Sequence, residues 1–236
     1  MRIALVRLAV GSLAAMSIAA SLALAADDLE KLRDRQDRVA LEKTAAALDA
    51  AAAKTPNDAN GWYRAAIAWS YAAEVATELR DKANAQTAAE TGVKDAEKAI
   101  AINGKVADYY RVLGTLCGQV IPANPILGAL AYGKRAKESL DKAIELDPKS
   151  ARAYVARGVG NYYLPANFGG GAENAMKDFR QAISLDAKNA DAYLWLGMAH
   201  KKLKQNAEAR EAFTRSLAID PDRIWARDQL EKTPAQ

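Results

Sequence analysis

One short segment with a small residue at its centre recurs along the chain at a changing interval. The four clear copies are AEKAIAING, LDKAIELDP, FRQAISLDA and FTRSLAIDP, which place Ala99, Ala143, Ala182 and Ser216 in one frame. A weaker copy places Ala51 there, and the successive intervals are 48, 44, 39 and 34 residues. A period in this range predicts a solenoid, in which each helix pair buries its apolar face against the next.

The remaining sequence also favours helices. It is rich in Ala, Leu, Lys and Glu, which are good helix formers, and it lacks the alternation of β-branched residues that is typical of strands. We therefore predict an all-α fold.

The last unit, residues 190–221, indicates the kind of helix pair. Gly197 and Ala209 lack bulk, so two helices can cross closely there, and Pro221 cannot continue the second helix. The unit resembles a tetratricopeptide repeat (TPR), through Tyr193, Leu196, Gly197, Ala209, Phe213, Leu217 and Pro221. The resemblance implies a TPR-type helical-hairpin solenoid.

The earlier units keep this frame but are longer. The two small residues of a pair lie 12 residues apart in the last unit and 17, 22 and 26 apart in the three before it. We place all the extra residues between the first and second helix of each pair, which predicts lengthened inter-helix loops. Two of these loops contain Pro-Ala-Asn, at 122–124 and 165–167. Insertions repeated on one edge of a solenoid are typical of a binding surface.

These observations predict the organisation of the whole chain. Residues Leu29 to Lys54 are expected to form one unpaired capping helix. The predicted segments are 1–25, a signal peptide; 26–58, the N-terminal cap; the helix pairs 59–104, 107–148, 151–187 and 190–221, which together span 59–221; and 222–236, a C-terminal capping helix and tail.

The first 25 residues have the features of a secretory signal peptide. Arg2 and Arg7 precede an uncharged run, residues 8–24, and Ala23-Leu24-Ala25 fits the small-x-small pattern for cleavage. We therefore expect a periplasmic or secreted protein, and an uncleaved membrane anchor stays open as an alternative. The one cysteine of the chain, Cys117, is not placed to accept a lipid.

The charge of the chain gives no indication of a nucleic-acid or anionic-membrane partner. The formal net charge is +4, and Arg2 and Arg7 account for half of it. A balance this close to neutral does not favour either kind of partner.

Catalytic groups are scarce. The single His200 and the single Cys117 provide no zinc site of Cys/His type, and we expect both to pack in the core. Gly169–Gly171 precede a helix, but Glu173 follows where a phosphate loop needs a cation, which favours a tight turn. We expect no enzyme activity, no metal and no cofactor, and an enzyme that uses carboxylates and tyrosines is the least favoured alternative.

The concave surface provides the first candidate site. In TPR proteins the first helix of each pair lines this surface, and the frame places Tyr and cationic side chains there that suit an extended peptide or a carboxylate ligand. A solvated face is the alternative. The candidates are Tyr63, Tyr71, Arg111, Gln119, Arg152, Tyr162, Tyr163, Met198 and Lys201, with Asn60, Asp108, Asp191 and Lys202 in the same frame.

The two Pro-Ala-Asn loops provide the second candidate surface. They would contact a partner or a sister subunit, or serve only as turns and helix caps. The residues are Pro122, Asn124, Pro165, Asn167 and Phe168.

A narrower resemblance rests on AETGVKDAEKAIAI, YYRVLG and a Pro-x-x-x-Gly-Gly loop. The chain resembles the periplasmic T component associated with tripartite ATP-independent periplasmic (TRAP) transporters. The matching residues are Gly92, Ala96, Ala99, Ile100, Tyr110, Gly114, Pro165, Gly169 and Gly170. The resemblance implies a helical, non-enzymatic partner of a solute-binding protein, in some cases a ring-like oligomer. Many members are lipoproteins, and this chain lacks the lipid-accepting cysteine.

We therefore expect an exported, non-enzymatic scaffold. It would bind a periplasmic protein or peptide through its concave groove or its loop edge. The alternative is an accessory component of TRAP-type solute transport, which binds a solute-binding protein, a small organic acid, or both. A homo-oligomer is also open.

Overall fold

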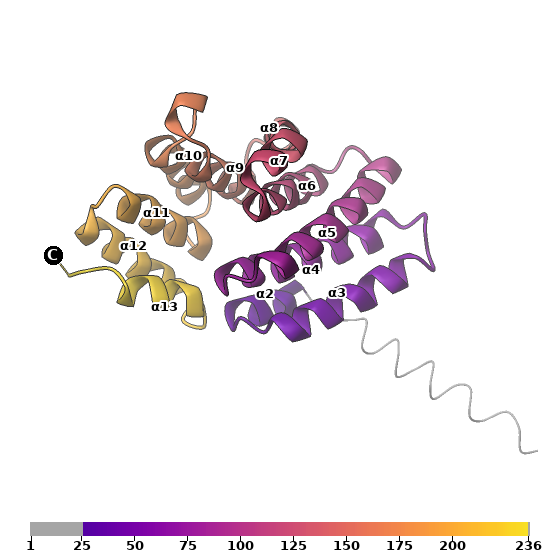
Figure 1. Cartoon of the computed structure of the whole chain (residues 1–236), viewed down its shortest axis with the longest axis horizontal. Helices are drawn as coiled ribbons and strands as arrows, with labels where there is room; N and C mark the ends of the chain where they lie inside the picture. The colour runs from indigo at the N-terminus through magenta and orange to yellow at the C-terminus, as the bar shows by residue number, and fades with distance from the viewer. Residues whose placement is uncertain (1–25, 236) are drawn as a thin grey trace, which may run out of the picture.

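The computed structural model describes residues 26–235, all of whose regular elements are helices (Figure 1). The predicted signal peptide lies outside the described residues. The helices are α2 (Ala26–Asp34), α3 (Arg38–Ala52), α4 (Ala59–Glu78), α5 (Lys82–Ile102), α6 (Ala107–Val120), α7 (Pro125–Gly128), α8 (Lys134–Leu146), α9 (Ala151–Tyr163), α10 (Ala172–Leu185), α11 (Ala190–Lys202), α12 (Asn206–Ile219) and α13 (Ile224–Glu231). Three short helical turns, η1 (Ile121–Ala123), η2 (Ala129–Gly133) and η3 (Ala166–Phe168), complete the set.

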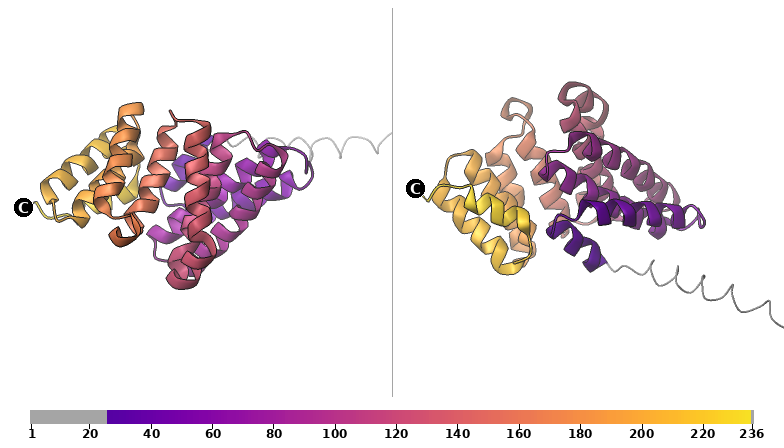
Figure 2. Two further views of the ribbon diagram at one scale, coloured as in Figure 1. Left: turned by 90° about the horizontal axis from the view of Figure 1, so that it is seen from above. Right: turned by 60° about the horizontal axis from the view of Figure 1, so that its bottom comes forward.

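The pairs α4–α5, α6–α8, α9–α10 and α11–α12 stack in chain order, each second helix against the first helix of the next pair. The first helices α4, α6, α9 and α11 also contact one another in sequence, so they form the inner layer of the solenoid. Figure 2 shows the resulting right-to-left progression from the N-terminal to the C-terminal helices. The all-α, TPR-type prediction is confirmed.

The inserted residues take three different forms. In the first pair they lengthen the helices, because α4 has 20 residues, α5 has 21, and only the turn 79–81 joins them. The expected long loop is therefore wrong for this pair. In the second pair the insertion folds into η1, α7 and η2. In the third it is a loop around η3, in which Gly169 and Gly171 have positive φ angles of 85° and 95°.

The N-terminal cap contains two helices, where one was expected. The chain turns sharply between α2 and α3 at Gln36, whose φ angle is 54°, and the carboxylate of Asp37 caps α3 by accepting from the amide of Ala40. α3 then packs on α4 as the second helix of a preceding pair would. α2 leaves this stack, and its position matters for the candidate site.

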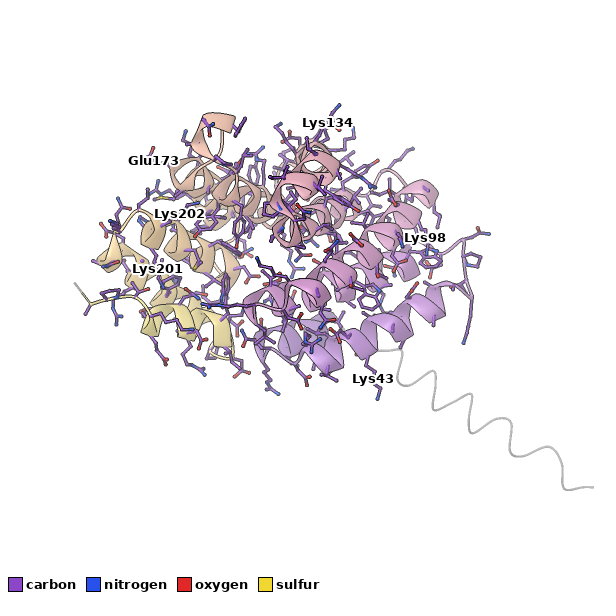
Figure 3. All side chains as sticks on the ribbon, viewed as in Figure 1. Lys43, Lys98, Lys134, Glu173, Lys201 and Lys202 are labelled. Atoms are coloured by element: carbon purple, nitrogen blue, oxygen red, sulfur yellow. The ribbon has the colours of Figure 1, made fainter. Side chains whose placement is uncertain are left out.

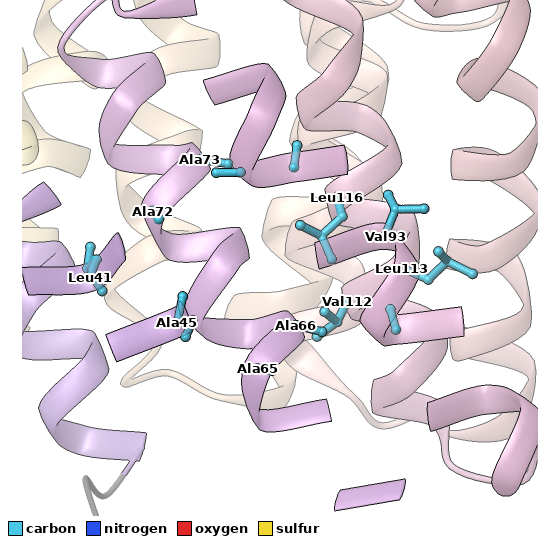
Figure 4. Close-up of a cluster of buried hydrophobic side chains, with 14 of the residues drawn as sticks. Leu41, Ala45, Ala65, Ala66, Ala72, Ala73, Val93, Val112, Leu113 and Leu116 are labelled. Atoms are coloured by element: carbon cyan, nitrogen blue, oxygen red, sulfur yellow. The ribbon is translucent and has the colours of Figure 1, made fainter. Parts of the chain in front are cut away.

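The largest core cluster lies between α3, α4, α5 and α6 and includes Leu29 of α2; nine of its 19 buried residues are alanines (Figure 4). Ala65, Ala66 and Ala73 are fully buried, and Leu116 fills the space beside them. Small side chains bring the helix axes close together, so a side chain larger than Ala has little room at these crossings.

Among the described residues, no helix is long and apolar enough to span a bilayer.

Gly158 tests this close packing, with Gly160 on the same helix as its control. A Cβ atom on Gly158 would lie 2.5 Å from the buried ring of Phe179, whereas the nearest atom to a Cβ on Gly160 is 4.0 Å away. We expect Gly158→Ala to lower the free energy of unfolding by about 1–3 kcal/mol through overpacking. Gly160→Ala should be neutral or stabilising by up to about 1 kcal/mol, because Ala favours helices. Urea unfolding followed by circular dichroism measures both, and equal effects would contradict the account.

Candidate functional site: the concave surface

Helix α2 lies against the inner layer of the solenoid (Figure 2, right). Glu30 accepts hydrogen bonds from the Tyr71 hydroxyl of α4, at 3.2 Å, and from the Arg152 guanidinium of α9, at 2.8 Å. The guanidinium of Arg33 lies 5.1 Å from the centre of the Tyr71 ring. A segment of the chain's own N-terminus thus occupies part of the surface that the repeat frame assigns to ligands.

Arg33 also joins α2 to the last helix pair. It is buried, and its Nη1 atom donates to Asp191 at the start of α11 at 2.8 Å. Its Nε atom donates to the neighbouring Asp34 at 2.8 Å. Burial alone would lower the pKa of Arg33, but the surrounding carboxylates, Asp191 first, raise it well above its usual range. Arg33 is therefore a buried, permanently charged link between α2 and the last helix pair.

Arg223 makes the second link, from the residue before α13 back to α4. Its guanidinium donates to Glu74 at 2.7 Å and to Glu78 at 3.2 Å, and its side chain is only 1% exposed. Asp34 lies 3.6 Å from its Nε atom. Glu78 also accepts from Gln36 at 2.9 Å. We call the set Arg33, Asp34, Glu74, Glu78, Asp191 and Arg223 the closing network.

The closing network holds more acidic than basic side chains, so not all of its carboxyl groups are ionised. Four carboxyl groups face two guanidinium groups, and burial raises the pKa of Glu74 to about 7 and that of Asp34 to about 6, against the lowering effect of the arginines. Burial would also raise the pKa of Asp191, but Arg33 and Arg223 lower it overall. Asp191 is thus the ionised partner, and Glu74 takes up a proton near neutral pH.

A smaller polar group lies further along the inner layer. The Tyr63 hydroxyl donates to Asp108, which also accepts from Arg111, with 2.8 Å from Nη2 to Oδ2. Burial alone would raise the pKa of Asp108, but the hydrogen bond and charge of Arg111 lower it. Tyr63 and Arg111 are therefore already paired within the chain.

An aromatic cluster continues the inner layer toward the C-terminus. The ring centre of Trp195 lies 5.7 Å from that of Tyr162, 6.0 Å from that of Tyr163 and 5.2 Å from that of Trp225. The guanidinium of Arg223 lies 5.6 Å from the centre of the Trp225 ring, so this cluster adjoins the closing network. Tyr163 is the exposed member, at 57%.

The structure brings some of the predicted groove residues together and separates others. Tyr71 and Arg152 meet at Glu30, and Tyr63 joins Arg111. Gln119 faces α4 instead, where it donates to the carbonyl of Ser70 at 3.1 Å. Met198 and Lys201 face the C-terminal cap helix α13. Met198 packs near Trp225, and Lys201 donates to Gln229 at 3.1 Å.

Sequence reasoning missed the partners of these residues. Glu30 and Arg33 lie in a segment that was expected to cap the solenoid, and Arg223 lies in the segment 222–236, which was also expected to form a cap. Glu74 and Glu78 stand four apart on α4, at the spacing of one helix face, which was the one available indication.

The residues of the two Pro-Ala-Asn loops have separate roles in the described structure. Asn124 caps α7 by accepting from the amide of Leu127 at 3.3 Å. Pro122 lines a surface pocket of about 190 Å³ with Gln119 and Arg80. Pro165 precedes η3, which contains Asn167 and the exposed Phe168.

The lone cysteine and histidine differ in their surroundings. Cys117 is fully buried, as expected, and burial raises the pKa of its thiol to about 11. His200 was also expected in the core, but it is only half-buried and its Nδ1 atom lies 2.7 Å from Oε1 of Gln205. Within the described range, no three His, Cys, Asp or Glu side chains are arranged to hold a metal ion.

Comparison with known families identifies the family of this chain. The family model described as "Regulator of microtubule dynamics protein 1-3" matches residues 22–164, more than half of the chain. The chain belongs to this family. Two further models, "TPR repeat" and "Tetratricopeptide repeat", match residues 169–204 and 190–223. The regulator of microtubule dynamics match and the TPR matches thus follow one another along one continuous solenoid.

Solved structures support the fold of this family member. A thermophilic TPR protein from Thermus thermophilus, TTC0263, is 17% identical with a TM-score of 0.60, over 86% of this chain and 96% of that one. The HusA haemophore from Porphyromonas gingivalis is 19% identical with a TM-score of 0.60, over 83% and 96%. These likenesses show the fold alone. No curated protein gives a significant match.

Arg223 is the most informative residue to change. Arg223→Met leaves the buried carboxylate of Glu78 without its cation, so we expect a loss of about 3–5 kcal/mol in the free energy of unfolding. Arg227→Met is the control, because Arg227 is exposed and donates only to the carbonyl of Pro221; its effect should stay within about 1 kcal/mol. Denaturant unfolding measures both variants. A loss at Arg223 no larger than that at Arg227 would show that the network does not hold the ends together.

The raised pKa of Glu74 predicts a pH dependence. The folded protein holds this proton more tightly than the unfolded chain, whose glutamates titrate at about 4.3. The contribution of Glu74 to stability should therefore decrease as the pH rises from about 5 to about 8. Glu74→Gln removes that titration, so the variant should melt above the wild type at the higher pH, and the difference should shrink at the lower pH. A difference in melting temperature that does not change with pH would contradict the assignment.

Proposed function

We propose that the protein is an exported, non-enzymatic TPR scaffold whose concave surface binds a short acidic segment of another protein. The observation that carries this proposal is the position of α2 on the inner layer. Tyr71 and Arg152 hold the Glu30 carboxylate from two different repeats, and Arg33 stacks on Tyr71. The surface thus holds a short helix with a carboxylate, and α2 serves as the internal stand-in for a partner.

The repeat architecture supports protein binding as the class of function. TPR solenoids generally act as scaffolds for peptides and proteins, and the matched family is named for regulators of microtubule dynamics, a role that involves other proteins.

Export is part of the same proposal. It rests on the basic start, the uncharged run and the Ala23-Leu24-Ala25 site. Cleavage after Ala25 would make α2, the stand-in, the first segment of the mature protein. Mass spectrometry of the N-terminus of the mature protein identifies the cleavage point.

Displacement of α2 tests the concave surface. We expect the chain that begins at Asp37 to bind a synthetic peptide of residues 26–36, followed by fluorescence anisotropy, while the chain that begins at Ala26 should bind it weakly because its own α2 occupies the site. Arg152→Ala should weaken binding about two- to fivefold, because the Arg152 side chain is 57% exposed and an exposed ion pair contributes up to about 1 kcal/mol.

Lys43→Ala is the matched control, because Lys43 is a cation on the exposed side of α3 (Figure 3). It should leave the affinity unchanged, and circular dichroism checks that each chain stays helical. Equal binding by the chains with and without α2, or no binding by either, would contradict the proposal.

Arginines on and beside the inner layer favour a second candidate. Arg111 on α6 and Arg152 on α9 belong to this layer, Arg33 and Arg223 lie beside it, and guanidinium groups suit a small organic acid as well as a peptide carboxylate. This chemistry would suit an accessory component of TRAP-type transport that acts beside a solute-binding protein. Displacement of the peptide by a small dicarboxylate in the same titration would favour this candidate.

A further inference from the structure

A surface pocket of about 190 Å³ lies between the turn that joins α4 to α5 and the insertion of the second helix pair. It is separate from the contacts that hold α2 on the inner layer. Its lining includes the first two residues of the first Pro-Ala-Asn sequence, to which the concave surface gives no role. Arg80, Lys82 and Ala85 line one side, and Gln119, Pro122 and Ala123 line the other. We call it the insertion pocket.

The charged lining of the insertion pocket has one sign. Arg80 and Lys82 are its charged lining residues among those that the structure describes, and both are exposed. Within the described part of the chain, neither side chain has a hydrogen-bond or ion-pair partner. The pocket therefore presents two cations that no carboxylate of the described chain contacts.

The acidic side chains nearest in sequence are engaged elsewhere. The carboxylate of Asp81 caps α5, because it accepts from the amide of Asn84 at 3.2 Å and from its side-chain nitrogen at 2.6 Å. Glu78 accepts from Gln36 at 2.9 Å and from Arg223 at 3.2 Å in the closing network. An anion from outside would therefore not have to displace an existing ion pair at the pocket.

The uncharged lining is mostly aliphatic. Ala85 is 5% exposed, and Pro122 and Ala123 belong to η1. Gln119 is held in place by Ser70, since it donates to the Ser70 carbonyl at 3.1 Å and accepts from the Ser70 hydroxyl at 3.2 Å. The pocket thus combines an apolar wall with two cations, which suits a ligand with one apolar and one anionic end.

The wall that η1 forms is held by the helix that follows it. Asn124 caps α7 by accepting from the amide of Leu127, and the amide of Gly128 donates to the carbonyl of Asn124 at 2.7 Å. A Cβ atom on Gly128 would lie 2.8 Å from the Cα atom of Ile121, so α7 packs directly on η1. A wall that is already folded reduces the entropy lost when a ligand binds.

The volume of the pocket limits the size of the ligand. A cavity of about 150 Å³ is large enough to bind benzene. The insertion pocket therefore has room for one ring or one branched aliphatic chain. A guanidinium group binds a carboxylate through two parallel hydrogen bonds, and an ammonium group adds a compact positive charge.

We infer that the insertion pocket binds a small carboxylate that carries one apolar ring or branched chain. The carboxylate contacts Arg80 and Lys82, and the apolar group lies against Ala85, Pro122 and Ala123. A free acid and the C-terminal residue of a peptide both have this chemistry. The ligand would connect the first helix pair to the insertion of the second. This inference does not depend on binding at the concave surface.

Titration with phenylacetate tests the inference. The chain from Ala26 is used because it contains every described helix. In two-dimensional ¹H–¹⁵N NMR spectra we expect saturable shifts of the amides of Arg80, Ala85, Gln119 and Ala123. The dissociation constant should be about 1 mM for a ligand of this size. Phenylacetamide, which is uncharged, should bind at least about fivefold more weakly because a charged hydrogen bond is lost.

Two charge variants test the cations. Arg80→Gln and Lys82→Gln should each weaken the binding of phenylacetate about two- to fivefold, because exposed ion pairs are weak. Glutamine suits the backbone at position 80, since Gln36 has a φ angle of 54° and Arg80 one of 63°.

Lys204→Gln is the matched control. Lys204 has the same place in the turn between α11 and α12, with a φ angle of 61° and the same backbone hydrogen bonds as Arg80, but it does not line the pocket. This variant should bind phenylacetate like the wild type.

Ala123→Leu tests the apolar wall. Its larger side chain would occupy the pocket, so the binding of phenylacetate should be lost while the charge of the pocket is unchanged. Circular dichroism checks that each variant stays helical, and the charge variants keep the test decisive if Ala123→Leu fails to fold.

Two peptides distinguish the sources of the carboxylate. One ends in phenylalanine with a free carboxylate, and the other is its C-terminal amide. If the first binds at the same amides and the second does not, the pocket takes a chain terminus. If phenylacetate binds and neither peptide does, the pocket takes free acids. Both results support the inference.

Three results would overturn the inference. Phenylacetate at about 10 mM, tenfold above the expected dissociation constant, could shift none of the four amides. The shifts could lie at Tyr71 and Arg152 on the concave surface instead. Lys204→Gln could weaken binding as much as Arg80→Gln does, which would show that the effect is not specific to the pocket.

Discussion

Two buried guanidinium groups, those of Arg33 and Arg223, determine the positions of the first and last helices, α2 and α13. A charged side chain that is removed from water has to be paired, and leaving it or its partners alone costs several kcal/mol. Arg33 and Arg223 come from opposite ends of the described chain, and their partners lie on α4 and α11. Pairing them requires α2 to lie on the inner layer and α13 to approach the first helix pair. The ends of an otherwise open stack of helix pairs are thereby tied together.

The same pairing explains the state of the concave surface. An open TPR groove offers Tyr and Arg side chains to a ligand, but here Tyr71, Arg152 and Arg111 already have partners from the chain itself. Binding of another protein at this surface therefore means exchange of one set of carboxylates for another, not the filling of an empty site.

The fold could be predicted from the sequence because its determinants are local and repeated. Gly158 and Gly197 must be small beside the Phe rings that they meet, and this requirement repeats in a recognisable frame. The position of α2 could not be predicted, because it depends on ion pairs between residues more than a hundred positions apart, such as Arg33 and Asp191. No periodicity marks such a pair.

The first insertion was misplaced for a related reason. A good helix former such as Ala extends a helix as readily as it enters a loop, and α4 and α5 are both rich in Ala. The predicted groove residues lie on the first helices of the pairs, yet the frame could not show that Gln119 turns toward α4 or that Met198 and Lys201 face α13.

Hydrogen exchange of the α2 backbone amides in the wild-type chain tests the central claim most directly. A nine-residue helix is too short to persist alone in water, so protection of its amides requires the tertiary contacts described above. If Arg33, Glu30 and Arg223 hold α2 on the inner layer, its amides should exchange nearly as slowly as those of α11. Amides in α2 that exchange at the rate of an unfolded peptide, while α4 and α11 stay protected, would show that the solenoid is open and that its N-terminal arm is free.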